Sequence, residues 1–447
     1  MRFLATIWLL LTLAAEGQTQ PTPENILASS LDDYMNSAHD AFRFNGMAVV
    51  LSHGKVLLEK GYGCSDWTTQ SPISTHTRFP LLSITKSFTA TVILKLQEEG
   101  RISLDDPLDR YVAGYPNGNR ITIRQLLSHT SGIHNYTDDV DETDTALINH
   151  PLSRERVIAQ IRDKPIDFKP GKRFSYNNSG YFLLGLVIEK ALGKSYEEAV
   201  RKYILTPAGM IESGFDFLGL PSTLKATGYQ VWSETEITTY NFYDSSYAWS
   251  AGALYSSGND MIRWASAILK RNIISSEDWQ LAFNPGRNQY GLGWQTGTFA
   301  GASYAKHSGG YPGFMSEFIY YPHEELFIIL LNNFGTYGQS VWPVAMGLSS
   351  IVLGKPYDLW KKRQEVDVPQ ELLRKYVGTY SYQSNRISVK FSDSRLWLNI
   401  PGIEPMALHA ESDRSFYLIN FNTSLKFSDG QVLIHEHGED LLWKRKH

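Results

Sequence analysis

The sequence predicts an α+β protein in which an antiparallel sheet is flanked by a helical region and followed by a small all-β barrel. Strand-like patterns lie on either side of a largely helical middle, which indicates one sheet built from both ends of a domain. From residue 373 onward, short alternating runs are separated by turn residues, as in a small barrel or sandwich. With 447 residues and 42% hydrophobic content, the chain is long enough for two or three domains with apolar cores.

The first residues have the pattern of a targeting segment. Arg2 precedes an apolar run over 3–15, and Ala15 and Gly17 offer small residues for cleavage. The run is too short for a spanning helix with ordinary flanks, so an uncleaved anchor is the weaker alternative. We therefore expect a signal peptide over residues 1–17, export to the periplasm or out of the cell, and no stable membrane span in the mature chain.

A charged stretch that contains Pro369 separates the two predicted folding units. Charged residues and a proline favour an exposed connection over a buried element. We place the first domain at residues 22–358, the linker at 359–369 and the small barrel at 370–447.

The first domain begins with a helix and a hairpin. Apolar residues at helical spacing predict a helix over 21–41, and the apolar runs 47–52 and 55–60 predict a β-hairpin. The stretch 79–99 indicates a short extended entry and then a helix that is buried on most of its circumference. Gly100 supplies the C-terminal stop of this helix.

The helical middle, the closing strands and the tail follow in order. Further helices are predicted over 102–112, from Thr122 to a break at 131–132, from about residue 181, over 197–205 and over 260–270. Strands are predicted at 291–296, 303–307, 313–321 and 326–332, and a helix at 339–353. In the tail, strands are predicted at 377–383, 387–391, 396–400, 406–410, 416–420, 425–427, 431–435 and 440–444.

Composition excludes several classes of function. The net charge is −4 and no basic cluster stands out, so a nucleic-acid partner is not expected. Cys64 is the only cysteine, which excludes an internal disulfide framework, and its turn-like surroundings favour a structural thiol. The twelve histidines form no HExxH pattern, and His435 and His437 alternate on a predicted strand. We expect neither a metal site nor a cofactor.

The head of the long apolar helix carries the first chemical motif, Ser83-Ile-Thr-Lys86. On a helix these two residues share a face, and a hydroxyl at the N-terminus lies at the positive end of the helix dipole, which favours an alkoxide. The same spacing also starts at Ser52, Ser222 and Ser303, so the pair alone is weak evidence, and an N-cap serine beside a solvated lysine is the plainer alternative. Only Ser83 opens a long, largely apolar helix.

The second motif is Tyr176-Asn-Asn178. A nucleophilic Ser83 needs a base, and either Lys86 or Tyr176 can serve if its pKa is depressed. The side-chain amide of Asn178 offers a donor and an acceptor, which suits the orientation of Lys86 and of a substrate amide. These four residues are therefore candidates for one site.

The third motif, His307-Ser308-Gly309-Gly310, ends a predicted strand, and we expect all four residues to contact the substrate. The backbone N–H groups of Ser83 and Gly310 are candidates for an oxyanion hole. The strand edge at the two glycines would let a peptide-like substrate lie alongside it. Each motif is common by itself, so the prediction rests on their joint order.

In this order, the motifs make the sequence similar to the class C β-lactamase-related serine hydrolases, which include low-molecular-weight penicillin-binding proteins, D-aminopeptidases and related esterases. The stretches 126–132 (Leu-Leu-Ser-His-Thr-Ser-Gly) and 170–178 make the resemblance specific, and it covers about residues 47–352. It implies a β-lactamase/transpeptidase-like sheet, with a lipocalin-like barrel as the tail. It also implies the following roles: acylated nucleophile for Ser83, base pair for Lys86 and Tyr176, and positioning group for Asn178.

One position departs from the family pattern, because class C β-lactamases carry a lysine where this chain has His307. A histidine is often neutral at pH 7 and then offers no fixed cation to a substrate carboxylate, so peptide and ester substrates gain weight over β-lactams. We expect an exported serine hydrolase that forms a covalent acyl-enzyme with small peptides, amides or esters. Two alternatives remain open: a penicillin-binding sensor or scaffold with slow or no turnover, and a non-catalytic binding protein that acts through its β-rich tail.

Overall fold

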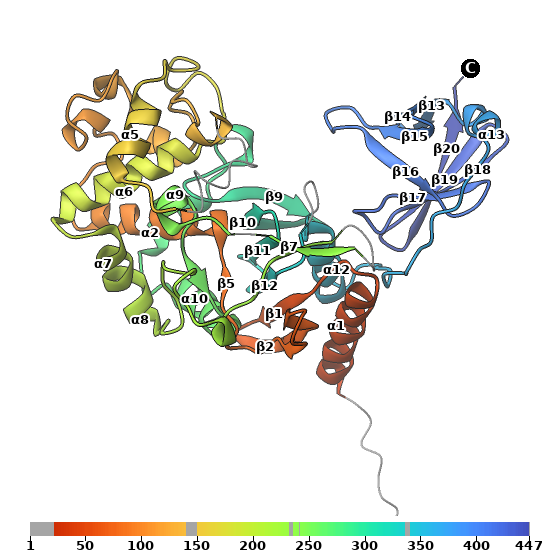
Figure 1. Cartoon of the computed structure of the whole chain (residues 1–447), viewed down its shortest axis with the longest axis horizontal. Coiled ribbons are helices and arrows are strands. Elements are labelled where there is room, and N and C mark those ends of the chain that lie inside the picture. Colours follow the sequence, from red (N-terminus) through yellow and green to blue (C-terminus); the bar gives the residue numbers. More distant parts are fainter. Residues whose placement is uncertain (1–21, 140–149, 232–235, 241, 336–339, 447) are drawn as a thin grey trace, which may run out of the picture.

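The structure is a computed structural model of the chain, and it describes residues 22–139, 150–231, 236–240, 242–335 and 340–446. The predicted signal peptide, residues 1–17, lies outside the described residues. Figure 1 shows a large part that combines helices with a sheet, and a separate barrel at the C-terminal end, which confirms the predicted fold class. Within the described ranges, no helix has the length and apolarity that crossing a membrane requires.

A six-stranded antiparallel sheet forms the centre of the large part, in the order β2-β1-β12-β11-β10-β9. N-terminal β1 pairs with β12 so that Gly46 lies opposite Asn332, which confirms a sheet built from both ends. The strands are β1 (Gly46–Ser52), β2 (Lys55–Tyr62), β9 (Gln295–Phe299), β10 (Ala302–Tyr311), β11 (Phe314–Tyr321) and β12 (Leu326–Asn332).

Strand β9 begins later than the predicted strand at 291–296. The Gly291 N–H donates to the Trp294 carbonyl at 2.8 Å, and Gly293 has a φ of 84°, a left-handed conformation that glycine adopts without strain. The first part of the predicted strand is therefore a tight turn, and pairing with β10 starts at Gln295.

The sheet buries both of its faces. Along β1, Met47 and Val49 pack toward the helical region, whereas Ala48 and Val50 pack toward the opposite layer. The opposite layer is formed by α1 (Pro23–Asp40) and α12 (Trp342–Val352), which lie together against the sheet in Figure 1. Both of these helices were predicted.

The helical region covers the other face of the sheet. Its longest buried element is α2, in which every residue from Thr85 to Leu94 is buried, as the sequence predicted. The helices of this region are α2 (Thr85–Glu98), α3 (Ile123–Leu127), α5 (Arg154–Arg162), α6 (Asn178–Leu192), α7 (Tyr196–Val200), α8 (Thr206–Ala208), α9 (Ser245–Ala248), α10 (Gly258–Lys270) and α11 (Ser276–Phe283). Short strand pairs lie around them: β3 (Cys64–Asp66) with β4 (Ser71–Pro72), β5 (Phe79–Pro80) with β8 (Tyr255–Ser256), and β6 (Tyr229–Val231) with β7 (Ile237–Thr239).

The predicted helix at 102–112 is wrong. Only a 3-10 turn, Leu108–Arg110, forms there, because Pro107 is extended and provides no N–H. Helix α6, in contrast, starts at Asn178 rather than near residue 181, because the side chain of Asn177 accepts the Gly180 N–H at 2.7 Å and caps the helix.

The tail forms a closed barrel of the strands β13 to β20, in which β13 pairs with β20. Each strand overlaps one of the predicted runs, although β17 ends at Tyr417 and covers only the first two residues of the run 416–420. The closed pairing shows that the tail is a barrel and not a sandwich. A short helix, α13 (Gln370–Lys375), precedes the barrel and was not predicted. The strands are β13 (Gly378–Tyr382), β14 (Asn385–Ser392), β15 (Arg395–Asn399), β16 (Met406–Ala410), β17 (Ser415–Tyr417), β18 (Ser424–Ser428), β19 (Gln431–Glu436) and β20 (Glu439–Arg445).

The connection between sheet and barrel contacts both of them. The Trp360 indole N–H donates to the Tyr34 hydroxyl of α1 at 2.9 Å, and the Asp358 carboxylate lies 2.9 Å from the His435 ring of β19. The domain limits 22–358, 359–369 and 370–447 stay predictions.

Candidate active site

Ser83 follows shortly after the short strand β5. Phe79 and Pro80 form β5 and pair with β8. Leu82 then has a φ of 54°, a strained conformation for a residue with a branched side chain. This turn places the partly exposed Ser83 in the 3-10 turn Leu82–Ile84 that opens α2.

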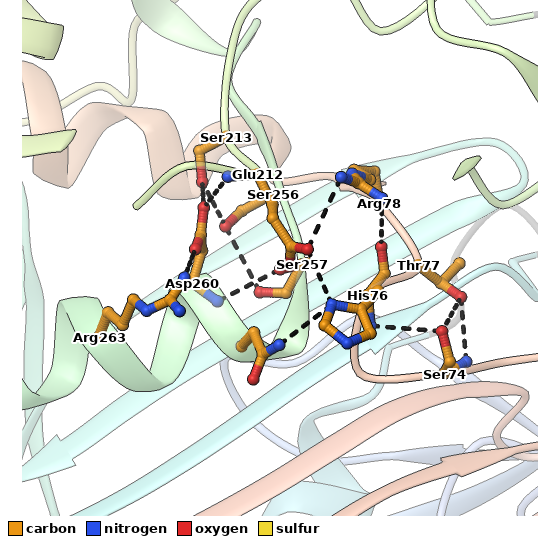
Figure 2. A network of polar contacts seen from close by, with 11 residues as sticks. Ser74, His76, Thr77, Arg78, Glu212, Ser213, Ser256, Ser257, Asp260 and Arg263 are labelled. Carbon is orange, nitrogen blue, oxygen red and sulfur yellow. Dashed lines mark hydrogen bonds and ion pairs between the residues drawn. The ribbon is translucent and has the colours of Figure 1, made fainter. Parts of the chain in front are cut away.

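A polar network holds the chain just before this segment, as Figure 2 shows. Arg78 precedes β5 and pairs with Glu212, with 3.7 Å between Nη2 and Oε1. Asp260, in the first turn of α10, is fully buried and accepts hydrogen bonds from the Glu212 N–H at 2.6 Å and the Ser213 hydroxyl at 2.8 Å. Arg263 compensates its charge at 2.7 Å. The network therefore connects α10 to the entry of α2.

Lys86 lies one turn after Ser83 and is fully buried. Its Nζ donates to Ser83 Oγ at 3.0 Å, to Asn178 Oδ1 at 2.7 Å and to the Ala251 carbonyl at 2.8 Å. In the described part of the chain, no carboxylate forms an ion pair with it. Burial lowers the pKa of Lys86 well below 10.5. A lowered pKa is the property that a base for Ser83 needs.

Two residues of the segment 135–137 fix the position of Asn178. Its Nδ2 donates to Thr137 Oγ1 at 3.0 Å, and its backbone N–H donates to Asn135 Oδ1 at 2.8 Å. These bonds leave its Oδ1 to accept from Lys86, so the predicted contact between these two residues is present in the structure.

Tyr176 lies against both Lys86 and Ser83. The centre of its ring is 5.0 Å from Lys86 Nζ, and its phenol lies close enough to the Ser83 side chain for Ser83 to affect its pKa. Burial raises the pKa of Tyr176, and the Ser83 side chain opposes this rise. Of the two predicted bases, only Lys86 thus has a depressed pKa, and the Tyr176 phenol stays protonated.

Behind Tyr176 lies a buried cluster of aromatic and imidazole rings. His129 contacts Tyr176 and Tyr290, with ring centroids 4.4 and 4.5 Å apart. The Tyr290 hydroxyl is 3.0 Å from His307 Nε2, and the His307 Nδ1 is 2.8 Å from the Ser308 carbonyl. Burial lowers the pKa of His307 to about 3, so its ring is neutral at pH 7, as the sequence analysis anticipated.

Strand β10 sends the side chains of its motif to opposite faces of the sheet. The Ser308 hydroxyl points to the far layer and donates to the Glu317 carboxylate at 2.9 Å. The Ser308 side chain therefore lies on the face of the sheet that is opposite to Ser83, and contact of Ser308 with substrate stays a prediction. His307 is on the near face, but its ring is only 1% exposed and supports Tyr290. Contact of His307 with substrate likewise stays a prediction.

The two glycines of the motif differ in their surroundings. A Cβ on Gly309 would lie 2.4 Å from the Leu81 carbonyl oxygen and 2.7 Å from the Leu82 Cβ, so only glycine lets β10 approach the segment before Ser83. A Cβ on Gly310 would meet nothing within 4 Å. Gly310 lines the pocket in front of Ser83.

Ser83 opens into a pocket of about 240 Å³. The pocket also contains Asn178 and Gly310, so the structure brings parts of all three motifs together. Among its described lining residues, Asp138 carries the one carboxylate, and none is lysine, arginine or histidine. Four tyrosines are among the residues that line it: Tyr136, Tyr243, Tyr247 and Tyr311.

Sequence reasoning assigned no role to several residues of this site. His129 lies within the stretch 126–132 that was quoted for the resemblance, so that stretch was its signal. Thr137 and Asp138 follow in a loop without a recognisable pattern, and Ala251 acts through its carbonyl, which no side-chain motif reveals. As to metals, the described residues contain no group of three or more His, Cys, Asp or Glu that could hold an ion.

The fold and the grouping of Ser83, Lys86 and Tyr176 define a class of serine hydrolases built on a β-lactamase-like sheet. The family described as Beta-lactamase matches residues 31–341. Because this match spans more than half of the chain, the protein belongs to that family and is a serine hydrolase by descent.

Relatives and solved structures agree with this assignment. Penicillin-binding protein 4* of Bacillus subtilis is 29% identical over 420 residues, which is 87% of this chain and 91% of the relative. The octameric penicillin-binding protein homologue from Pyrococcus abyssi is 27% identical, with a TM-score of 0.67 over 93% of this chain and 99% of that one. The D-amino acid amidase from Ochrobactrum anthropi, 21% identical with a TM-score of 0.64 over 74% of this chain and 98% of that one, shares the fold.

Proposed function

We propose that this protein hydrolyses small peptides, amides or esters through a covalent acyl-enzyme at Ser83. The observation that carries the proposal is the 3.0 Å contact between Ser83 Oγ and Nζ of the fully buried Lys86. Because burial lowers the pKa of this lysine well below 10.5, the neutral amine is available as a base nearer to neutral pH.

In the first step, neutral Lys86 takes the proton of Ser83 Oγ, and Oγ bonds to the substrate carbonyl carbon. The carbonyl oxygen becomes an oxyanion, for which we assign the backbone N–H groups of Ser83 and Gly310 as donors. When the bond to the leaving group breaks, the protonated phenol of Tyr176 donates its proton and regains one from Lys86. Water then bonds to the acyl carbon while Lys86 takes one of its protons. As the bond between Oγ and the acyl carbon breaks, Lys86 returns that proton to Ser83 Oγ and the acid product departs.

The charges around the pocket support uncharged or cationic substrates over anionic ones. Asp138 is exposed at the pocket and would attract an ammonium group, whereas the neutral His307 offers no cation to a substrate carboxylate. The tyrosine-rich wall suits a small apolar or aromatic acyl group. Amino acid amides and short esters are therefore favoured over β-lactams.

The decisive experiment compares wild type with Ser83→Ala on a panel of an amino acid amide, a short ester, a small peptide and a β-lactam. We expect the substitution to reduce hydrolysis by about a thousandfold or more, because the nucleophile is lost. Ser303→Ala is a matched control, since Ser303 has the same spacing to a lysine but lies exposed on β10. Hydrolysis by Ser83→Ala at the wild-type rate would refute the proposal.

A slowly acylating penicillin-binding sensor is the second candidate, and the name of the Bacillus subtilis relative favours it. A fluorescent penicillin that labels Ser83 and stays bound, with no hydrolysis of any panel member, would establish that candidate instead. Absence of labelling by both the penicillin and a fluorophosphonate would leave the non-catalytic binding protein.

We also propose that the protein is exported, because residues 1–17 have the pattern of a signal peptide. N-terminal sequencing of the protein recovered from its native host is expected to begin after residue 17. An intact Met1 on the mature protein would contradict export by cleavage.

A further inference from the structure

The barrel contains a cavity of about 650 Å³, larger than the pocket at Ser83. This volume lies within the range of about 300–1,000 Å³ that is usual for small-molecule sites. The strands supply its apolar walls: Ile387, Leu398, Met406, Leu418, Ile434 and Trp443. Elsewhere in the core of this domain, Tyr376 stacks on Phe427 with ring centroids 4.5 Å apart.

The mouth of this cavity exposes large apolar side chains. Ile403 is 55% exposed and Phe421 is 38% exposed, and both line the cavity. Exposed aliphatic and aromatic surface that continues into an apolar cavity favours a ligand with an apolar body.

Within the wall, Trp443 has an unsatisfied donor. Its side chain is buried to more than nine-tenths, and its indole N–H has no hydrogen-bond partner in the described structure. A buried donor without an acceptor costs free energy, so a ligand oxygen at this position would be stabilised.

At the rim, Arg386 supplies a positive charge that the described residues do not neutralise. Its side chain lines the cavity and forms neither a hydrogen bond nor an ion pair with any residue that the structure describes. The one acid at the cavity, Glu436, is already engaged by the Thr423 hydroxyl at 3.3 Å and by His437 at 3.9 Å. Arg386 is therefore the one cationic side chain among the lining residues, and no carboxylate of the described structure pairs with it.

We propose that the barrel is a binding site for a small amphipathic anion, with an aliphatic chain in the cavity and an oxygen-bearing head that meets Arg386 and the Trp443 N–H. A medium-chain carboxylate has this chemistry. The proposal concerns a second site and does not depend on the reaction at Ser83.

The test titrates decanoate into the full-length protein by calorimetry, with decanol and decyltrimethylammonium as comparison ligands. We expect saturable one-to-one binding of decanoate, at least about fivefold tighter than either comparison ligand, because only decanoate pairs with the guanidinium. Arg386→Gln is expected to weaken decanoate about fivefold and to leave decanol unchanged. Trp443→Phe keeps the apolar wall and is expected to weaken both decanoate and decanol about threefold.

Arg395→Gln is the matched control, because Arg395 is an exposed arginine of the same barrel that does not line the cavity. It is expected to bind decanoate as wild type does, and so is Ser83→Ala, whose barrel is intact. The proposal is overturned if wild type shows no saturable decanoate binding, if decyltrimethylammonium binds as tightly as decanoate, or if Arg386→Gln and Trp443→Phe both bind like wild type. Equal thermal unfolding of all variants excludes loss of folding as the cause.

Discussion

Two lysines on opposite sides of the sheet, the fully buried Lys86 and the half-buried Lys306, each donate a hydrogen bond to a nearby serine. Lys306 also pairs with the buried Glu317 at 3.1 Å and lies 4.2 Å from the Trp342 ring. Lys86 has only neutral oxygen acceptors, and burial lowers its pKa. Because a carboxylate stabilises the ammonium form of a lysine and burial alone disfavours it, Lys306 suits a structural role and Lys86 suits a base.

Removal of the Lys86 amine is the most direct test of the difference between the two lysines. Lys86→Met is expected to lower kcat/KM by about a thousandfold or more, because Ser83 loses its base. The free energy of unfolding should stay equal or rise, since a buried amine without a carboxylate partner is replaced by an apolar chain. Steady-state kinetics and urea denaturation measure the two effects, and a variant that keeps its activity would show that another group is the base.

The lowered pKa of Lys86 also predicts the direction in which kcat/KM and the free energy of unfolding change with pH. Since the folded lysine loses its proton below 10.5, kcat/KM is expected to rise with pH through that lowered pKa. Between the lowered pKa and 10.5 the unfolded chain binds more protons, so the stability of wild type should rise with pH, and Lys86→Met should lack this component. His307 cannot cause the rise at neutral pH, because its pKa is about 3.

The opposite result is expected for Lys306. Lys306→Met leaves Glu317 buried without its partner, which should lower the free energy of unfolding by about 3 kcal/mol. The folded fraction should keep kcat/KM within about tenfold of wild type, and adding Glu317→Gln should restore part of the stability. Loss of catalysis comparable to that of Lys86→Met, at full stability, would remove the distinction between the two lysines.

Alanine substitutions at Gly309 and Gly310 test the different surroundings of the two faces of β10. Gly309→Ala forces a Cβ against the Leu81 carbonyl and is expected to cost about 1–3 kcal/mol of stability. Gly310→Ala, whose Cβ meets no atom within 4 Å, should change stability by less than about 0.5 kcal/mol. Thermal unfolding of both variants measures the difference, and equal losses would mean that β10 does not approach Leu81 as described.

The smallest expected effect concerns the carboxylate at the pocket. Asp138→Asn should lower kcat/KM for an amino acid amide with a free ammonium about fivefold relative to an uncharged ester of the same acyl group, because exposed charges contribute little. The ratio of the two substrates is the measurement. An unchanged ratio would show that Asp138 does not pair with the ammonium group of the substrate, whereas Glu317 pairs with the ammonium group of Lys306.

Much of the fold could be predicted because its signals are local. The eight runs of the tail alternate with a period of two, and each became a strand. The helix at 102–112 failed because Pro107 ends the helical pattern, and α6 began earlier than predicted because the cap at Asn177 was not recognised. The short α13 lies in a charged segment whose helical signal is only one turn long.

The site could be predicted only in part. Ser83, Lys86, Tyr176 and Asn178 assembled as expected, since their motifs indicate both residue type and place in the chain. The direction of Ser308 depends on the pleat of β10, and a shift of one residue reverses it. His129 and the Ala251 carbonyl act through contacts with residues far away in the chain, so no local pattern identifies them.

The sequence by itself determined most of the order of helices and strands, the all-β nature of the tail and the residue types of the three motifs, because periodicity and spacing are properties of neighbouring residues. Only the tertiary structure decided that Lys86 rather than Lys306 lacks a carboxylate, that the Tyr176 phenol stays protonated, and that the barrel keeps an open apolar cavity. Desolvation and ion pairing depend on groups that folding brings together from distant segments.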